Sequence, residues 1–276
     1  MLAIELLPRH SILPGGWPSG LEYKDCLWGN ALFDIHSHIL PEVDDGAKSW
    51  DITLEMCRMA QADGIQHMVA TPHANERYAY DRDAHEARLA ELRTRFGNGM
   101  EFSLGCDFHM SYDNLQDLQL HPRRYSIAGE RYILVELSNY SIPPQIDEAM
   151  MRMGELDLTP VLTHPERNPI LQENLARVLG WAEHGCVVQI TASALTGKWG
   201  ERSQQAALLL LRHQAVHVIS TDAHDTERRP PILSTARAVA AELFGDQVAR
   251  SLVLHNPEAI IRGRPLPYFP KTLKKA

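Results

Sequence analysis

Histidines and carboxylates recur in one setting along this sequence, at or just beyond the ends of short apolar runs. The first run ends in His36 and His38. Residues two apart on a strand point to the same face, so both imidazoles can reach one ion. Later runs end in the same way, at His73, Glu136, His164, Asp222 and His224. Imidazole and carboxylate together suit Zn, Mn or Fe, and the absence of cysteine from these positions argues against a structural zinc site.

The number of these side chains points to a cluster of ions. More than four ligands imply more than one divalent cation. The alternative is a set of hydrogen-bonded histidines in the core or in loops. We disfavour it, because buried imidazoles need partners, which these residues could find only in one another.

Two arginines follow the same positions closely, Arg167 after His164 and Arg229 after His224. Guanidinium groups match phosphate oxygens in geometry, so arginines beside a metal cluster indicate a phosphorylated substrate. Ion pairs with Glu166 and Glu227 are the alternative. The neighbouring Arg228 leaves the second assignment open.

The elements that must position these side chains alternate along the chain. Apolar runs predict strands at 31–36, 67–71, 101–104, 132–137, 160–163, 186–191 and 216–220. Expected helices include one capped by Ser49 and closed by Gly64, one from Leu171 that ends at His184 and Gly185, and two at 204–212 and 235–244. This alternation favours parallel β-structure, and seven units without a glycine-rich nucleotide motif fit a barrel better than a doubly wound sheet. In a barrel, chemistry gathers where strands end.

Length and composition fit that architecture. At 276 residues we expect one catalytic domain at 31–265, between an irregular leader (1–30) and a short tail (266–276). A net charge of -8 argues against nucleic acid as a partner, although bound cations would cancel much of it. No span reaches membrane length, so direct membrane insertion is not expected. The four cysteines lack paired metal spacing, which suggests reduced thiols in the cytoplasm.

In combination, these motifs resemble the polymerase-and-histidinol-phosphatase (PHP) superfamily. Within it they look most like the bacterial manganese-dependent protein-tyrosine phosphatases of capsule and exopolysaccharide clusters. The match runs in order from about residue 33 to about 265 and is carried by His36-x-His38, Val43-Asp44-Asp45-Gly46, Thr71-Pro72-His73, Val135-Glu136-Leu137, Thr163-His164-Pro165-Glu166-Arg167, and Thr221-Asp222-Ala223-His224 with Arg229-Pro230-Pro231.

The resemblance implies a distorted (β/α)7 barrel with three divalent metal ions, manganese first and iron or zinc as alternatives. Arg167 and Arg229 would hold the phosphate. Asp44 could serve in place of Asp45, since neighbouring carboxylates are hard to separate by motif. The implied ligands are His36, His38, Asp45, His73, Glu136, His164, Asp222 and His224.

One position departs from the family pattern. Where the family usually has Gly-x-Glu after the third strand, this chain has Gly105-Cys106-Asp107. Asp107 is one methylene shorter than glutamate, and we still expect it to bridge two ions. The shorter reach predicts a shift in metal affinity or preference.

The expected function is dephosphorylation of a phosphotyrosine-containing protein, such as a bacterial tyrosine autokinase of capsule or exopolysaccharide synthesis. Direct attack on phosphorus by a hydroxide generated at the metal ions is the expected step. Histidinol phosphatase or PHP-type nuclease activity is one alternative, and a non-catalytic PHP binding module is another. Cysteine-based phosphatases are excluded, because no cysteine has an arginine six positions later. Five aromatic residues lie in expected loops near the same face, where each could pack a substrate's phenyl ring or pack only within its loop: Tyr78, Tyr80, Tyr112, Tyr140 and Trp199.

Overall fold

The computed structural model describes residues 31–272. The predicted leader (1–30) and the end of the predicted tail (273–276) lie outside the described residues. The strands are β1 (Leu32–Ser37), β2 (Ile65–Ala70), β3 (His73–Ala74), β4 (Glu101–Leu104), β5 (Asp107–His109), β6 (Tyr132–Glu136), β7 (Thr159–Thr163), β8 (Val187–Thr191) and β9 (Val218–Ser220). The helices are α1 (Trp50–Asp63), α2 (Arg82–Phe96), α3 (Tyr112–Leu120), α4 (Gln145–Arg152), α5 (Pro169–Glu173), α6 (Leu175–Glu183), α7 (Ala192–Leu195), α8 (Glu201–Arg212), α9 (Ser234–Phe244), α10 (Asp246–Arg250) and α11 (Asn256–Ile261), with short 3₁₀ or π segments η1 (Ile127–Gly129), η2 (Met153–Leu156) and η3 (Ser251–His255).

The predicted strands are all present, and two further strands extend them. β3 and β5 are two and three residues long, too short to show as apolar runs. β3 continues the line of β2 beyond Thr71 and Pro72, and β5 continues that of β4 beyond Gly105 and Cys106. Both short strands begin with a predicted metal ligand, His73 and Asp107.

The prediction of a closed barrel is not confirmed. All described pairs of strands are parallel, but they form two sheets, β1-β2-β4 and β3-β5-β6-β7-β8-β9, and neither closes. β4 ends before it reaches β6, and only its extension β5 pairs with β6. At the other side, β1 meets the segment after β9 through a single bridge between Ser37 and Ala223.

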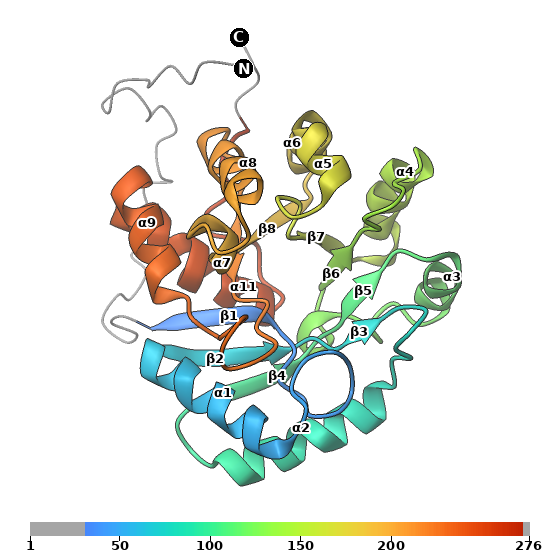
Figure 1. Ribbon diagram of the computed structural model, residues 1–276. Coiled ribbons are helices and arrows are strands. Elements are labelled where there is room, and N and C mark those ends of the chain that lie inside the picture. The colour runs from blue at the N-terminus through green and yellow to red at the C-terminus, as the bar shows by residue number, and fades with distance from the viewer. Residues whose placement is uncertain (1–30, 273–276) are drawn as a thin grey trace.

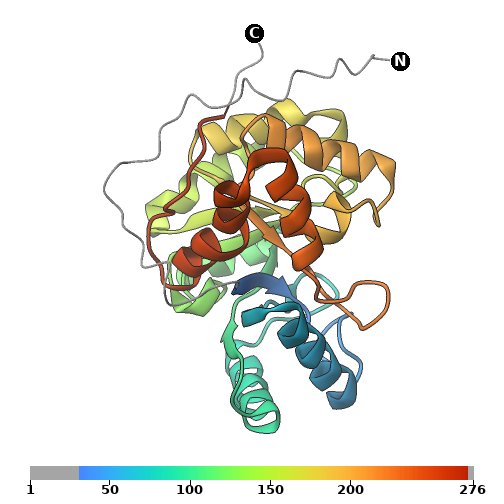
Figure 2. The same cartoon turned by 90° about the vertical axis from the view of Figure 1, so that its left-hand side faces the viewer.

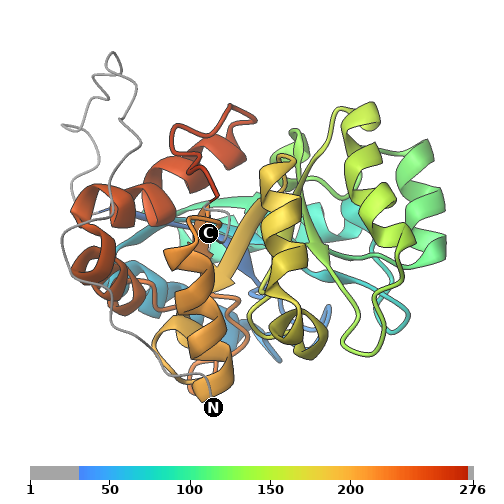
Figure 3. The ribbon, with the colours of Figure 1, turned by 90° about the horizontal axis from the view of Figure 1, so that it is seen from above.

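Apolar side chains nevertheless make the two sheets one body. Strands of both sheets and α11 contribute to a shared buried cluster that includes Phe33, Val69, Leu134, Val161, Val187, Val218 and Ile260. A larger cluster lies between the strands and the surrounding helices. Figure 1 shows α1 and α2 along the outer side of β1-β2-β4, and Figure 2 shows this blue-to-teal part below the yellow-to-red part. From above, helices lie outside the strands around most of the molecule (Figure 3).

Helix boundaries follow the predicted capping chemistry in α1. The Ser49 hydroxyl accepts a hydrogen bond from the Ile52 amide at 3.3 Å, and Gly64 ends the helix with φ of 97°, a left-handed conformation that glycine adopts without strain. The single helix expected from Leu171 is instead two helices, α5 and α6, because Asn174 leaves helical geometry between them. No helix among residues 31–272 is long and apolar enough to span a membrane.

His217, just before β9, gives the fold a predicted sensitivity to acid. Its side chain is fully buried, and Nδ1 accepts a hydrogen bond from the Val188 amide at 3.0 Å. Burial lowers the pKa of His217 to about 3. The unfolded chain, with the ordinary pKa near 6.5, therefore binds the proton more readily, so this contribution to stability is present above pH 6.5 and declines as pH falls toward 3.

We expect the free energy of unfolding to fall by about 2 kcal/mol from this residue between pH 8 and pH 5. Urea unfolding of the wild type and of His217→Gln at both pH values checks this. The two proteins share every other titratable group, so the difference between the two slopes isolates His217. Equal slopes would contradict the prediction.

Candidate metal centre

The nine predicted ligands lie together at the carboxyl ends of the strands. Four overlapping groups of side chains have ligand atoms within 4.8 Å of one another, and among residues 31–272 such groups contain the nine predicted residues and no others. The groups are His38, Asp45, His73 and His224; His36, His38 and Asp107; His36, His164 and Asp222; and His73, Asp107 and Glu136. Four of the nine belong to more than one group, namely His36, His38, His73 and Asp107, which is the arrangement expected of neighbouring ions that share ligands.

The distances around His36 and His38 suit a shared cation. Their Nε2 atoms are 3.3 Å apart, and Oδ1 of Asp222 lies 3.3 Å from the first and 3.4 Å from the second. Two donors that each stand about 2.1 Å from an ion, at angles of 90–110°, are separated by roughly 3.0–3.4 Å. The three atoms can therefore contact one ion with little rearrangement.

A second group is built around Asp45, in the loop after β1. Its Oδ1 lies 3.3 Å from Nε2 of His73 and 3.5 Å from Nε2 of His224. Asp44 points elsewhere: its Oδ2 accepts from Nδ1 of His38 at 2.7 Å, and its Oδ1 accepts from the Gly46 amide at 2.8 Å. The geometry favours Asp45 as the ligand of this loop and Asp44 as the residue that orients His38.

The third side of the cluster is carried by the six-stranded sheet. Asp107, which opens β5, places Oδ2 3.2 Å from Nδ1 of His73 and 3.5 Å from Nε2 of His36. Glu136, which ends β6, lies 3.6 Å from His73 and 3.8 Å from His164. Asp107 thus stands between two groups, and its bridging of two ions stays a prediction.

Local backbone geometry explains why these loops reach the cluster. A Cβ atom on Gly46 would stand 2.1 Å from the carbonyl oxygen of His38, so only glycine allows the loop to fold back on the end of β1. His164 and Asp222 have φ of 34° and 52°, in the left-handed region that side chains other than glycine rarely adopt. Strain of this kind costs on the order of 1–3 kcal/mol per residue and concentrates at functional sites.

Hydrogen bonds indicate which ring nitrogen faces the cluster in three of the histidines. Nδ1 of His36 lies 2.9 Å from the side-chain oxygen of Gln189, and Nδ1 of His224 lies 3.0 Å from the Asp222 carbonyl oxygen. With Nδ1 as the donor, as in His38 to Asp44, Nε2 keeps its lone pair for a metal. Sequence reasoning missed Gln189. The available signal was a polar residue inside an otherwise apolar predicted strand.

Several atoms of the cluster lack the partners that buried polar groups require. Both carboxylate oxygens of Asp107 and Nδ1 of His73 are buried without a hydrogen bond. A carboxylate in that position needs a cation or a donor, and the surrounding set of imidazole and carboxylate groups is the one that Zn, Mn and Fe prefer. The residues present therefore fit a multinuclear metal centre.

Protons on the histidines can also balance part of the negative charge of the clustered carboxylates. Burial opposes a charged imidazole, but the carboxylates of Asp222 and Asp107 outweigh it and raise the pKa of His36 to about 9. Nearby carboxylates likewise outweigh burial at His73 and raise its pKa to about 11. At His224, burial prevails and lowers the pKa to about 4. Because metal ligands must be deprotonated, metal binding at His36 and His73 requires the release of protons.

The two predicted arginines lie beside the cluster and share one carboxylate. A guanidinium nitrogen of Arg167 and one of Arg229 each contact Oδ2 of Asp222, whose other oxygen faces the histidines. The alternative ion partners, Glu166 and Glu227, do not take these roles. Glu166 is fully buried and accepts a hydrogen bond from the Thr191 amide at 2.8 Å.

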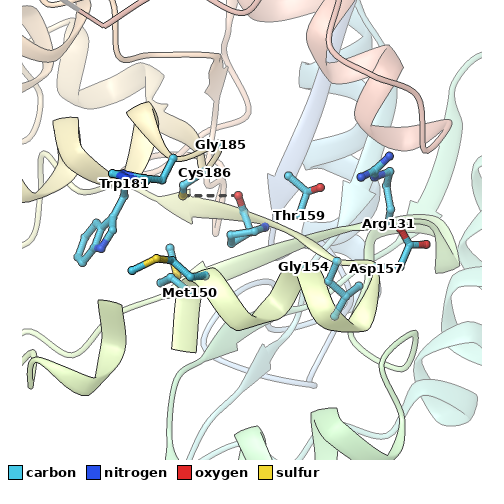
Figure 4. A pocket seen from close by; sticks show the side chains of 12 residues that line it. Arg131, Met150, Gly154, Asp157, Thr159, Trp181, Gly185 and Cys186 are labelled. Carbon is cyan, nitrogen blue, oxygen red and sulfur yellow. Dashed lines mark hydrogen bonds between the residues drawn. The ribbon is translucent and has the colours of Figure 1, made fainter. Parts of the chain in front are cut away.

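One cavity elsewhere among the described residues offers no comparable chemistry. A cavity of about 220 Å³ is lined by Met150, Trp181 and Cys186, with Arg131 and Asp157 at its side (Figure 4). It lies at the starts of β7 and β8, the opposite end of these strands from the candidate ligands. Burial raises the pKa of the Cys186 thiol to about 12, so no reactive thiolate lies there.

Asp107 provides a test of the ligand set. We expect Asp107→Ala to lower the metal content of the purified protein, because it removes the carboxylate that stands between two groups. Asp107→Glu is expected to retain or raise metal content, since it restores the longer side chain of the family pattern. Metal analysis of folded protein at a fixed free manganese concentration measures both. Unchanged metal content in the alanine variant would show that Asp107 is not a ligand.

Comparison with known proteins finds relatives that are tyrosine-protein phosphatases. CpsB, a tyrosine-protein phosphatase of Streptococcus pneumoniae, is 27% identical over 239 residues, which cover 83% of this chain and 98% of that protein. YwqE, a tyrosine-protein phosphatase of Bacillus subtilis, is 28% identical over 237 residues, which cover 84% of this chain and 92% of that protein.

Solved structures give the same result. A crystal structure from work on YwqE of B. subtilis and CpsB of S. pneumoniae, described as metal-dependent tyrosine phosphatases, aligns with a TM-score of 0.78 and 28% identity, over 88% of this chain and all of that one. A histidinol phosphate phosphatase from Lactococcus lactis shares the fold, with a TM-score of 0.51 and 12% identity, over 77% of this chain and 94% of that one. The family model for capsular polysaccharide synthesis, CpsB/CapC, matches residues 32–262, and the chain therefore belongs to the CpsB/CapC family.

Proposed function

We propose that this chain is a metal-dependent phosphatase that hydrolyses phosphotyrosine in proteins. The observation that carries the proposal is Asp222, which faces metal-ligand histidines with one oxygen and two arginines with the other. A cation cluster and a pair of guanidinium groups on either side of one carboxylate form a site for a phosphoryl group. The relatives named above, which bear the tyrosine-phosphatase name, support the same activity.

We infer that the nine clustered side chains hold three divalent cations, with manganese preferred. When bound, such ions acidify a water molecule for attack on phosphorus and stabilise the charge on the phosphoryl group and the leaving oxygen. The chain itself holds the ligand side chains in the orientations that the ions require. Asp44 and Gln189 orient His38 and His36 through Nδ1, and the left-handed backbone at His164 turns that side chain into the cluster.

The arginines are assigned to the phosphate. Each guanidinium group has five N–H donors, so it can keep one hydrogen bond to Asp222 while other donors bind the phosphate. Those donors bind the non-bridging oxygens, where charge develops during phosphoryl transfer. A phenolate, with a pKa near 10, leaves more easily than an alkoxide. A site that relies on cations and guanidinium groups therefore favours an aryl ester.

The preferred substrate in this proposal is a phosphotyrosine-containing protein of capsule or exopolysaccharide synthesis, specifically a tyrosine autokinase of the cytoplasm. The family's assignment to capsular polysaccharide synthesis supports this choice of pathway. We further propose that residues 31–265 act as the catalytic domain. The family match at 32–262 supports those limits.

The test is a comparison of kcat/KM, with manganese supplied, for four substrates: a flexible phosphotyrosine peptide, a phosphoserine peptide, histidinol phosphate and a DNA end. The phosphotyrosine peptide is expected to be hydrolysed at least about tenfold faster than the others, because only it combines an aryl leaving group with a freely accessible phosphate. A preference for histidinol phosphate or DNA would leave the metal centre in place and overturn the substrate.

A further inference from the structure

Trp199 lies over both arginines of the site. Cζ of Arg167 is 3.8 Å from the centre of the Trp199 ring, and Cζ of Arg229 is 5.5 Å from it. Trp199 belongs to the segment after β8, a strand that contributes no candidate ligand although its neighbours β7 and β9 both lead into one. The segment after β8 thus reaches the site through an indole ring instead of a metal ligand.

The chain holds this ring in a defined place. Nε1 of Trp199 donates a hydrogen bond to the hydroxyl of Ser193, in α7, at 2.7 Å. The amide of Lys198 donates to the Ser193 carbonyl at 2.9 Å, which closes the turn that carries the tryptophan. One residue of α7 therefore fixes both the turn and the orientation of the ring.

A contact with an aromatic ring can stabilise the arrangement of the two arginines. Their guanidinium groups converge on a single oxygen of Asp222, where two like charges repel each other. An aromatic face attracts a guanidinium through its quadrupole and fixes the plane of the guanidinium group. Asp222 constrains where the two groups sit, and the ring constrains how they are turned.

We propose that Trp199 is a positioning residue that holds Arg167 and Arg229 in the orientation that receives a phosphate group. The inference rests on the proposed function only in taking these arginines as the phosphate-binding groups. The competing role for an aromatic residue at this place is to stack on the phenyl ring of the substrate. A guanidinium already lies against the Trp199 ring at 3.8 Å, which favours the positioning role.

The experiment compares the manganese-loaded wild type with Trp199→Ala, Trp199→Phe and Ser193→Ala. Calorimetry measures the affinity for inorganic phosphate, and kinetics gives kcat and KM for an aryl phosphate and for an alkyl phosphate. The matched control is Phe269→Ala. Phe269 is 47% exposed, against 37% for Trp199, and its ring contacts His217 at the opposite end of β9.

We expect Trp199→Ala to weaken phosphate binding and to lower kcat/KM roughly tenfold for both substrates, with metal content unchanged. Trp199→Phe should recover most of the loss, since it keeps an aromatic face, and Ser193→Ala should lose about two- to threefold, because the ring stays but its hydrogen bond does not. Phe269→Ala should match the wild type in both measurements.

Unchanged phosphate affinity in Trp199→Ala would overturn the inference. A loss confined to the aryl substrate, with phosphate affinity intact, would also overturn it and assign the ring to substrate stacking. The proposed function can fail separately. If the wild type binds phosphate but does not hydrolyse phosphotyrosine, the proposed substrate is wrong. A weaker phosphate affinity in Trp199→Ala would still support the positioning role.

Discussion

Removal of divalent cations is expected to abolish hydrolysis of an aryl phosphate, and added manganese is expected to restore it better than zinc or magnesium. The physical reason is that no cysteine among residues 31–272 is available as a nucleophile in place of a water molecule at the site. The described cysteines, Cys57, Cys106 and Cys186, are buried, and burial raises the pKa of each thiol. Without cations the carboxylates of the cluster would also repel a phosphate dianion.

The measurement is the initial rate on 4-nitrophenyl phosphate after exhaustive chelation and dialysis, then after titration with each metal. Circular dichroism on the same samples separates loss of activity from loss of fold. A sample stripped of metal that keeps the rate of the untreated protein would rule out a metal-dependent reaction.

Loss of either arginine is expected to lower kcat/KM by about 10²-fold or more, since each supplies an oriented donor to charge that develops in the transition state. Arg167→Ala and Arg229→Ala should keep their metals, because the ligand atoms remain. Arg228→Ala is the matched control: it removes the same charge from an exposed position one residue away.

Arg167→Lys and Arg229→Lys refine this result. Lysine keeps the charge but not the planar fork, so partial activity is expected from each. Metal analysis must accompany the kinetics, because both arginines contact Asp222, a candidate ligand. If both alanine variants and Arg228→Ala all have near-normal rates, the contacts of Arg167 and Arg229 with Asp222 are structural ion pairs only.

The sequence predicted the strands and the residues that cluster at their ends, because both follow from local patterns. Apolar runs mark buried strands, and the parallel arrangement then places all strand ends at one edge. His73 and Asp107 could be named as candidate ligands although β3 and β5 were not predicted. The motifs mark both positions, with aspartate in place of the family's glutamate at Asp107, whereas a strand of two or three residues has no periodicity to detect.

Features that depend on contacts between distant segments were not accessible in this way. The choice between a closed barrel and two sheets depends on whether β4 pairs with β6 and β1 with β9, and strand propensity does not encode this. Similarly, the contact of Trp199 with Arg167 joins segments that only the fold brings together. Whether Asp44 or Asp45 faces the other candidate ligands depends on the directions of two adjacent side chains, which the motif does not encode.

The division into two sheets has a consequence for the stability of the folded chain. His36 lies in the three-stranded sheet, whereas His73, Asp107 and Glu136 lie in the six-stranded sheet, and the groups they form overlap. A cation held by this cluster would act as a cross-link between the sheets, where the chain passes from β4 to β5. Binding to the native state alone raises stability by mass action, by about 2.7 kcal/mol at one hundred times the dissociation constant. The melting temperature of this protein should therefore report the free metal concentration of its surroundings.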